Sequence, residues 1–351
     1  MQRRVTFLDA VRGVALVLMV VNHTARDWMD GVMGWGRYYL IYGSLLLPAP
    51  LFLFLAGFCL PIARSRGGAP GRARDYARRG LVIVGAGYLL NAVVLTEQPV
   101  WSGGVLQTIG LALIVLGALT PFIHRRHTQV ALLAGSVALY TSFAAALPWL
   151  ANWSSEHPRI ARALFNDFPP WPWIAPAALG LVLGWWWLEA RARGPEHEAR
   201  YFTTTAMIGA ACLAAWIAWE SLVPTTPRFG FPRDYVLNRH WTPRGATLLL
   251  IAGTIALLLA GMYALMERRG YRLRVLVILG QTALMLYFVH QMIELTLLKN
   301  VLGWRFNDWT LYGVALAGFL AGLVYLARLW LTVRSHGRGR GSPAPGLPLA
   351  R

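Results

Sequence analysis

The chain has 351 residues, of which 56% are hydrophobic and only 14% charged, and its mean hydropathy is +0.47. Together with several apolar runs long enough to cross a bilayer, this composition excludes a soluble globular protein and predicts a polytopic membrane protein. The net charge of +18 would suit a nucleic-acid partner. The basic residues lie in short segments between the apolar runs, however, and the positive-inside rule explains that distribution better. No nucleic-acid binding is therefore expected.

The hydrophobic pattern predicts ten membrane-spanning helices. In chain order they cover residues 8–25, 40–63, 77–96, 103–123, 129–149, 172–190, 201–222, 246–266, 274–298 and 309–333. With the N-terminus placed in the cytoplasm, the inner segments hold about twice as many Lys and Arg residues as the outer ones. We expect an all-α bundle of about ten transmembrane helices with both termini cytoplasmic, in a bacterial cytoplasmic (inner) membrane.

The C-terminal segment differs in composition from the rest of the chain. Residues 335–351 are rich in Gly, Pro and Arg, which predicts a disordered cytoplasmic tail after one membrane domain at residues 1–334. Arg64 and Arg66 belong to a basic inner loop between the second and third predicted spans. Such clusters most often determine topology, but an anionic nucleotide arriving from the cytoplasm would meet them first.

The first predicted span carries three ionisable side chains. Asp9 and Arg12 stand three residues apart near its inner end, and His23 follows Arg12 by eleven residues. Eleven residues are close to three helical turns, so Arg12 and His23 lie on one face, roughly 16 Å apart along the axis. Asp9 also fits a simpler role, as a helix cap that pairs with Arg12. Because such groups are costly inside a membrane, the pattern favours a functional site with two ends at different depths.

Several polar side chains share the outer third of the membrane. Counted from the inner ends of their spans, His23 and His290 reach similar depths, ~22 and ~24 Å. Four further polar residues approach the same level: Gln107, Asn91, Glu294 and Glu220. This coincidence predicts a hydrated cavity open to the outer face, in which Glu294 is placed to accept a proton from His290 one turn earlier. The alternative is that these groups form interhelical hydrogen bonds that only hold the bundle together.

The same residues give no indication of a metal or a disulfide. Neither histidine within the spans has a second His or Cys at ligand spacing, so no metal site is expected. Cys59 and Cys212 both lie in apolar segments, where small buried side chains are a better interpretation than a disulfide.

Several local patterns, in order along the chain, resemble one family of membrane enzymes. The opening Leu8-Asp9-Ala-Val-Arg12-Gly13, with His23 to follow, is similar to the start of transmembrane acyltransferases, including the type-three enzymes that O-acylate glycans. Gly104-Val-Leu-Gln-Thr-Ile-Gly110 resembles a segment of the heparan-alpha-glucosaminide N-acetyltransferase catalytic-domain family. Further segments with this likeness are Pro50–Gly57, Phe168–Trp173 with the later Gly180 and Gly184, and Leu286–Gln291.

The resemblance implies an integral membrane O- or N-acyltransferase. Such an enzyme takes an acyl group, here expected to be acetyl, from cytoplasmic acyl-CoA and delivers it to a glycan or other small acceptor at the extracytoplasmic face. Acetyl-CoA or another acyl-CoA is then the donor, no metal is involved, and the oligomeric state stays open. In the eukaryotic glucosaminide enzyme the proposed catalytic His lies in the loop after the first span. Residues 26–39 of this chain hold no His, so that role passes to His23.

In this interpretation His23 is the general base, because an imidazole suits proton transfer near neutrality. His290 and Gln107 orient the acceptor or donate hydrogen bonds to the oxyanion. Arg12 holds the phosphate or pantetheine part of the donor. The remaining candidates are Arg64 and Arg66 for cofactor binding, and Asp9, Asn22 and Glu294 as supporting residues.

A proton-coupled secondary transporter or flippase is the alternative, with His23, His290 and Glu294 as a proton relay. Broken helices and corresponding half-repeats would favour it, and the sequence gives no convincing pair. A non-catalytic membrane scaffold would explain the spans, but not six polar groups at one depth.

Overall fold

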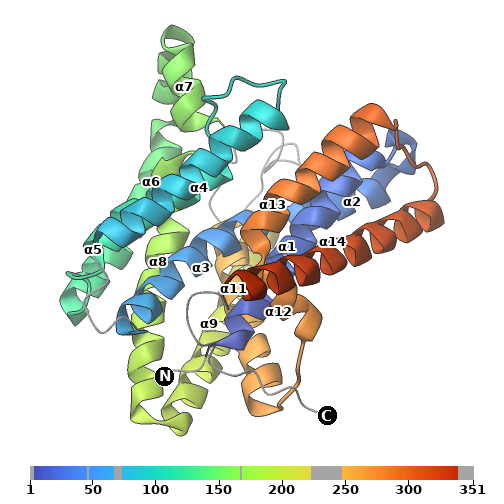
Figure 1. Cartoon of the computed structure of the whole chain (residues 1–351). Helices are drawn as coiled ribbons and strands as arrows, with labels where there is room; N and C mark the ends of the chain where they lie inside the picture. Colours follow the sequence, from blue (N-terminus) through green and yellow to red (C-terminus); the bar gives the residue numbers. More distant parts are fainter. Residues whose placement is uncertain (1–3, 46, 67–72, 167, 223–246, 339–351) are drawn as a thin grey trace.

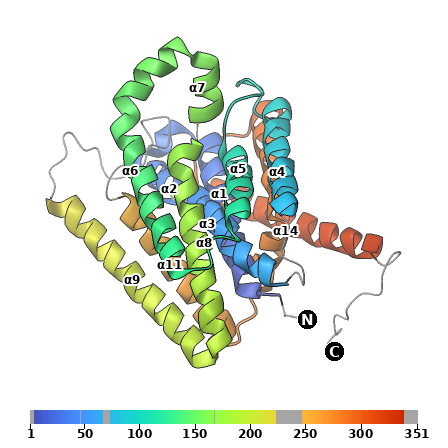
Figure 2. The same ribbon diagram turned by 90° about the vertical axis from the view of Figure 1, so that its left-hand side faces the viewer.

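The computed structural model describes residues 4–45, 47–66, 73–166, 168–222 and 247–338. Within these ranges the regular secondary structure is helical, apart from one isolated β-bridge between Met29 and Phe306. Figures 1 and 2 show the long helices packed side by side, with α1 in the middle of the bundle. The all-α prediction is confirmed.

The helices have the following bounds. They are α1 (Thr6–Trp28), η1 (Gly31–Met33), α2 (Gly34–Leu45), α3 (Pro48–Arg66), α4 (Ala73–Val93), α5 (Val105–Leu119), α6 (Arg126–Glu156), α7 (Pro158–Phe165), α8 (Pro170–Arg193), α9 (Pro195–Leu222), α11 (Thr247–Tyr263), η2 (Ala264–Arg268), α12 (Arg274–Gln281), α13 (Ala283–Gln291), η3 (Met292–Val301) and α14 (Trp309–Arg338). η2 and η3 are π-helical.

Among the described residues, six helices are long and apolar enough to cross a membrane, or up to eight if each of two bent helix pairs forms one span. The ten predicted spans included residues 77–96 and 103–123, which fall in α4 and α5. The first turns of α4 are charged, and α5 has only 15 residues, about 22 Å of helix. Neither helix therefore passes as a full span by length and composition. The chain is nevertheless an integral membrane protein.

Glycines let α3 and α8 cross with their backbones in contact. A Cβ built on Gly57 of α3 would lie 1.8 Å from the carbonyl oxygen of Ala177 in α8. A Cβ on Gly180 of α8 would lie 2.1 Å from the carbonyl oxygen of Phe54 in α3. No side chain fits at either position, so these glycines set the close approach of the two helices, as small residues do in other membrane helix pairs.

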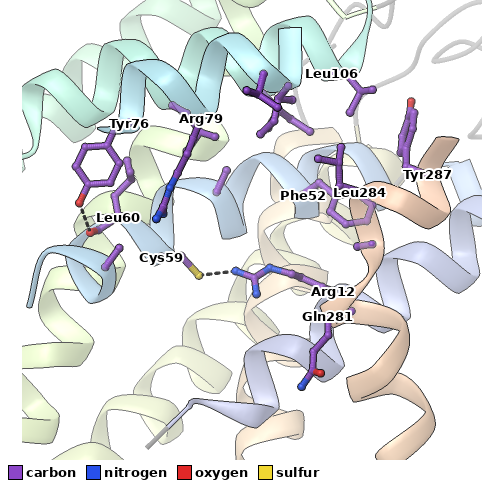
Figure 3. A pocket seen from close by; sticks show the side chains of 18 of the residues that line it. Arg12, Phe52, Cys59, Leu60, Tyr76, Arg79, Leu106, Gln281, Leu284 and Tyr287 are labelled. Atoms are coloured by element: carbon purple, nitrogen blue, oxygen red, sulfur yellow. Dashed lines mark hydrogen bonds between the residues drawn. The ribbon is translucent and has the colours of Figure 1, made fainter. Parts of the chain in front are cut away.

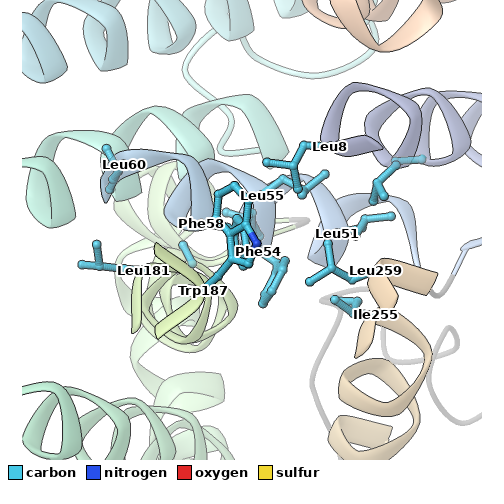
Figure 4. Close-up of a cluster of buried hydrophobic side chains, with 14 of the residues drawn as sticks. Leu8, Leu51, Phe54, Leu55, Phe58, Leu60, Leu181, Trp187, Ile255 and Leu259 are labelled. Atoms are coloured by element: carbon cyan, nitrogen blue, oxygen red, sulfur yellow. The ribbon is translucent and has the colours of Figure 1, made fainter. Parts of the chain in front are cut away.

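The largest hydrophobic core surrounds this crossing. Phe58 is fully buried, and its ring lies 5.7 Å from that of Trp187 between centroids. Figure 4 shows these rings beside Phe54, with Ile255 and Leu259 of α11 on one side of the cluster. This packing holds α3 in place, and α3 carries several residues of the site described below.

α1 and α12 cross in the same way, and the chain then turns sharply. A Cβ on Gly280 would lie 1.8 Å from the carbonyl oxygen of Asp9, and one on Gly13 would lie 2.1 Å from that of Leu276. Directly after this crossing, the helix axis bends by 80° between Arg274–Gln281 and Ala283–Val301. The span predicted at residues 274–298 is therefore a broken helix rather than a continuous one.

The C-terminal helix continues further than the sequence indicated. α14 runs to Arg338, four residues into the range that we predicted to be a disordered tail from residue 335. The rest of that predicted tail, residues 339–351, lies outside the described residues.

Candidate active site

The two histidines of the predicted spans meet in the structure. Nδ1 of His23 on α1 lies 3.0 Å from Nε2 of His290 on α13. The two rings are nearly parallel, with an interplanar angle of 12° and centroids 5.2 Å apart. His290 is fully buried, whereas His23 is only partly buried. A pair of imidazoles from segments 267 residues apart therefore forms one unit, here called the histidine dyad.

The hydrogen bonds of the dyad determine which nitrogen of His23 can act as a base. Nδ1 of His290 lies 2.8 Å from the carbonyl oxygen of Leu286, which can only accept, so this nitrogen carries a proton. In a neutral His290 ring, Nε2 is then an acceptor, and Nδ1 of His23 donates to it. Nε2 of His23 is left with a lone pair. The dyad thus fixes one tautomer of His23, in the way that an orienting group fixes a catalytic histidine.

Glu294 does not orient His290 as the sequence indicated. Both ring nitrogens of His290 have other partners, and the buried Glu294 carboxyl contacts Asp27 instead. Asp27 also accepts hydrogen bonds from Lys299 at 2.7 Å and from Arg26 at 3.2 Å. These residues form a charged cluster at the end of α1, beyond the dyad. Sequence reasoning missed Asp27 and Lys299 as partners, because 272 residues separate them.

A polar cavity of about 210 Å³ opens beside His23, here called the outer cavity. Its polar lining is dominated by carboxamides: Asn22, Asn91, Gln98, Gln107 and Gln291, together with Arg26 and His23. Gln107 on α5 has its side chain against Gly87 of α4, where a Cβ would lie 2.7 Å from the amide. The glycine therefore makes room for Gln107, whose amide donates to the carbonyl oxygen of Ser102 at 3.3 Å.

Two of the asparagines are also structural hydrogen-bond donors. The buried Asn22 donates to the carbonyl oxygen of Ile41 at 2.6 Å, which ties α1 to α2. Asn91 donates to the carbonyl oxygens of Val100 and Ser102 at 3.0 and 2.8 Å and so holds the loop before α5. These contacts fit the alternative interpretation given above, in which the amide groups form hydrogen bonds that only hold the bundle together. The side chain of Glu220, predicted at the same depth, lies outside the described residues.

A larger cavity of about 750 Å³ lies nearer the N-terminal end of α1. It is here called the inner cavity, after the predicted cytoplasmic placement of the N-terminus. Four arginines line it: Arg4, Arg12, Arg78 and Arg79. The rest of its wall is mostly apolar, and Figure 3 shows Arg12 and Arg79 pointing into it from different helices. A basic rim on an apolar cavity suits a ligand that joins phosphates to a less polar arm.

Arg12 is held in place on both sides. Its guanidinium donates to Asp9 at 2.9 Å and to Sγ of Cys59 on α3 at 2.8 Å (Figure 3 shows the second contact). The buried Asp9 also pairs with Arg4 at 2.6 Å, so it links two of the cavity's arginines. The predicted pairing of Asp9 with Arg12 is thus present in the structure. The predicted cap is not, because α1 begins one turn earlier, with Val5 at the N-cap position and no side-chain cap hydrogen bond.

The arginines chosen from the inner loop are not those that line the inner cavity. Arg64 is not among the residues of its wall, and the side chain of Arg66 lies outside the described residues. Arg78 and Arg79, near the start of α4, line the inner cavity where Arg64 and Arg66 were expected. All four arginines belong to one arginine-rich stretch of the sequence, residues 64–79.

The two cavities share part of their walls. Tyr287 and Leu106 line both the inner and the outer cavity, and His23 faces only the outer one. A basic compartment toward one end of α1 is thus followed by the histidine dyad and a carboxamide-lined compartment toward the other. Among the described residues, no group of three or more His, Cys, Asp or Glu side chains is arranged to hold a metal ion.

Apolar helices around a cavity with a basic rim and an adjoining cavity lined by carboxamides define an integral membrane protein with an internal site. Residues 4–220 match the family model described as "Heparan-alpha-glucosaminide N-acetyltransferase, catalytic". Because this match spans more than half of the chain, the chain belongs to that family of membrane acetyltransferases. No curated protein was found to match the chain. The matched range contains Arg12, His23 and Gln107, whereas His290 lies beyond it.

Proposed function

We propose that this protein transfers an acetyl group from cytoplasmic acetyl-CoA to a hydroxyl or amine of a glycan or other small acceptor at the outer face of a bacterial inner membrane. The observation that carries the proposal is the fixed tautomer of His23. His23, which keeps a free lone pair on Nε2, borders the outer cavity. The basic inner cavity adjoins the outer cavity. The positive-inside bias supports cytoplasmic termini, which puts the arginines on the donor side.

The chemistry follows from the dyad. The acceptor hydroxyl or amine attacks the thioester carbonyl, and its proton passes to Nε2 of His23. When the tetrahedral intermediate collapses, the carbon–sulfur bond breaks and the coenzyme A thiolate takes that proton from His23. The products are the acylated acceptor and coenzyme A. His290 is the positioning residue, because it holds His23 in the required tautomer.

The surrounding residues have matching roles. Arg12, Arg78 and Arg79 bind the phosphates or the polar part of the donor, since guanidinium groups pair well with phosphate oxygens. Gln107 donates to the oxyanion or the acceptor from the wall of the outer cavity. Asp9 and Asn22 support the site by holding Arg12 and α2, and Glu294 supports it by packing beside Asp27. We retain Arg64 and Arg66 only as basic residues that a nucleotide would meet on its approach.

Arg12→Ala should weaken donor binding. Loss of a charge-assisted hydrogen bond of this kind costs about tenfold or more in affinity, so KM for acetyl-CoA should rise by at least that factor. The measurement is the acetyl-CoA dependence of transfer by the purified protein in detergent. Because the variant leaves the buried Asp9 with one partner fewer, D9N/R12A should be measured beside it. Arg74→Ala, an exposed arginine outside the inner cavity, is the control. An unchanged KM in both Arg12 variants would remove Arg12 from the donor site.

The function itself can be tested with inverted membrane vesicles, which expose the cytoplasmic face. Radiolabelled acetyl-CoA is added outside, and a mixture of amino sugars and short glycans is loaded inside. The proposal expects covalent label on an internal acceptor, and no label with vesicles that carry His23→Ala. The break at Thr282 is also of a kind that transporters use. Movement of unmodified solute without labelling would therefore favour the transporter and contradict the transferase.

A further inference from the structure

A third and much smaller space lies beside the dyad, here called the small chamber. Its volume is about 60 Å³. Its walls are mostly apolar and come from four helices (α1, α3, α5 and α13) and the segment before α8. The apolar residues include Met19, Ala49, Phe52, Val105 and Phe168, and the polar ones are Asn22 and His23. The chamber therefore combines an apolar lining with the base of the proposed reaction.

The size of the chamber limits what it can hold. One water molecule occupies ~30 Å³ in the liquid, so the chamber offers about twice that space. This is enough for two or three heavy atoms, the size of an acetyl group. Toward Met19, Pro48 and Ala49, which among the three spaces line only this one, each further methylene of a longer acyl chain would have to displace a wall at a cost in free energy.

The position of the chamber relative to the inner cavity is the second observation. Phe52 and Tyr287 line both spaces, so they stand where the two meet. In Figure 3 both residues lie at one side of the inner cavity, away from Tyr76 and Arg79. Tyr287 also contacts His290 edge-on, with ring centroids 5.9 Å apart. A thioester at the end of an arm in the inner cavity would therefore reach the chamber past Phe52 and Tyr287, with its carbonyl near His23.

We propose that the small chamber is the acyl-binding subsite and that its apolar walls restrict the transferred group to acetyl. This inference rests on the proposed function. It assigns acyl-chain selectivity to Ala49 and Val105, a role that the sequence analysis gave to neither residue. Of the three spaces, Ala49 lines only the small chamber, whereas Val105 lines both the small chamber and the outer cavity.

Two substitutions with opposite effects test the subsite. Val105→Ala removes two methyl groups from the wall, so the ratio of kcat/KM for propionyl-CoA to that for acetyl-CoA should rise about tenfold. Ala49→Val adds two methyl groups, so acetyl transfer should fall by about tenfold or more. Coenzyme A binding should stay unchanged in both, because the arginines of the inner cavity are untouched. Val115→Ala and Ala118→Val on α5 make the same two changes at exposed positions outside the three spaces.

The results separate the subsite from the function on which it rests. The subsite assignment is wrong if the wild type transfers acetyl and both chamber variants, while binding coenzyme A, show the acyl preference and rate of the wild type. If Ala49→Val does not fold, the propionyl to acetyl ratio of Val105→Ala decides alone. If the wild type transfers no acyl group from any acyl-CoA to any tested acceptor, the proposed function fails, and the subsite fails with it.

Discussion

His23→Ala is expected to lower the rate of acetyl transfer by about 10²–10⁴-fold, the usual contribution of a general base. The substitution removes the only ring nitrogen of the dyad that the hydrogen bonds leave with a lone pair. His23 does not line the inner cavity, so KM for acetyl-CoA should change little. The measurement is steady-state transfer in detergent, with coenzyme A binding measured separately. His336→Ala, an exposed histidine on α14, is the control.

Variants of His290 test the same mechanism in a second way. His290→Phe keeps a ring of similar size but cannot accept the hydrogen bond from Nδ1 of His23, so kcat should fall while KM for the donor holds. His290→Gln keeps a carbonyl oxygen that can accept this bond, and it should recover part of the rate. Because the two residues act as a unit, H23A/H290F should be no slower than H23A alone. Full activity of His23→Ala, or a further loss in the double variant, would contradict the dyad mechanism.

The meeting of the two histidines could be approached from the sequence because helix geometry is regular. A count of 1.5 Å per residue from the inner ends of two straight spans predicted that His23 and His290 lie at one depth. The structure bends the second span by 80° before His290, so the count is valid for α1 alone. Depth does not give the rotation of either helix, however, and the ring contact at 3.0 Å depends on that rotation. The sequence therefore predicted the shared level, and only the structure supplied the contact and the tautomer.

Glu294 shows where the same regularity failed. In an α-helix, residues i and i+4 share a face, and this placed Glu294 beside His290. The helix changes to π-helical geometry at Met292, which adds a residue to the turn and rotates the residues after it. Glu294 consequently contacts Asp27. The sequence shows no sign of this change, because His290, Gln291 and Glu294 keep the spacing of one α-helical face.

The donor side shows a different limit. Composition predicted a basic region on the inner side, but in such a prediction every arginine of a loop counts equally. Which of them turn inward depends on how α3, α4 and α5 pack. Gly80 of α4 packs against Gly110 of α5, where a Cβ would lie 2.5 Å from its carbonyl oxygen. This close approach places the start of α4, with Arg78 and Arg79, against the inner cavity.

Gly280→Ala is expected to disrupt the fold and the site together. The new Cβ would lie 1.8 Å from the carbonyl oxygen of Asp9, well short of the 3.4 Å at which ordinary van der Waals contact begins. Since the obstacle is backbone, α12 must move away from α1, at a cost of about 3 kcal/mol or more. We expect a clear drop in the thermal unfolding temperature in detergent. Transfer should also be lost, because α12 leads through the 80° bend to His290.

The matched control is Gly313→Ala on α14, where a Cβ would meet no atom within 4 Å. The chemical change is identical, and an exposed helical glycine gains rather than loses about 1 kcal/mol on this substitution. The comparison also separates packing from catalysis. His290→Phe should lose transfer while it keeps its unfolding temperature, whereas Gly280→Ala should lose both. If Gly280→Ala melts like the wild type and transfers acetyl normally, then the α1–α12 crossing does not position the dyad.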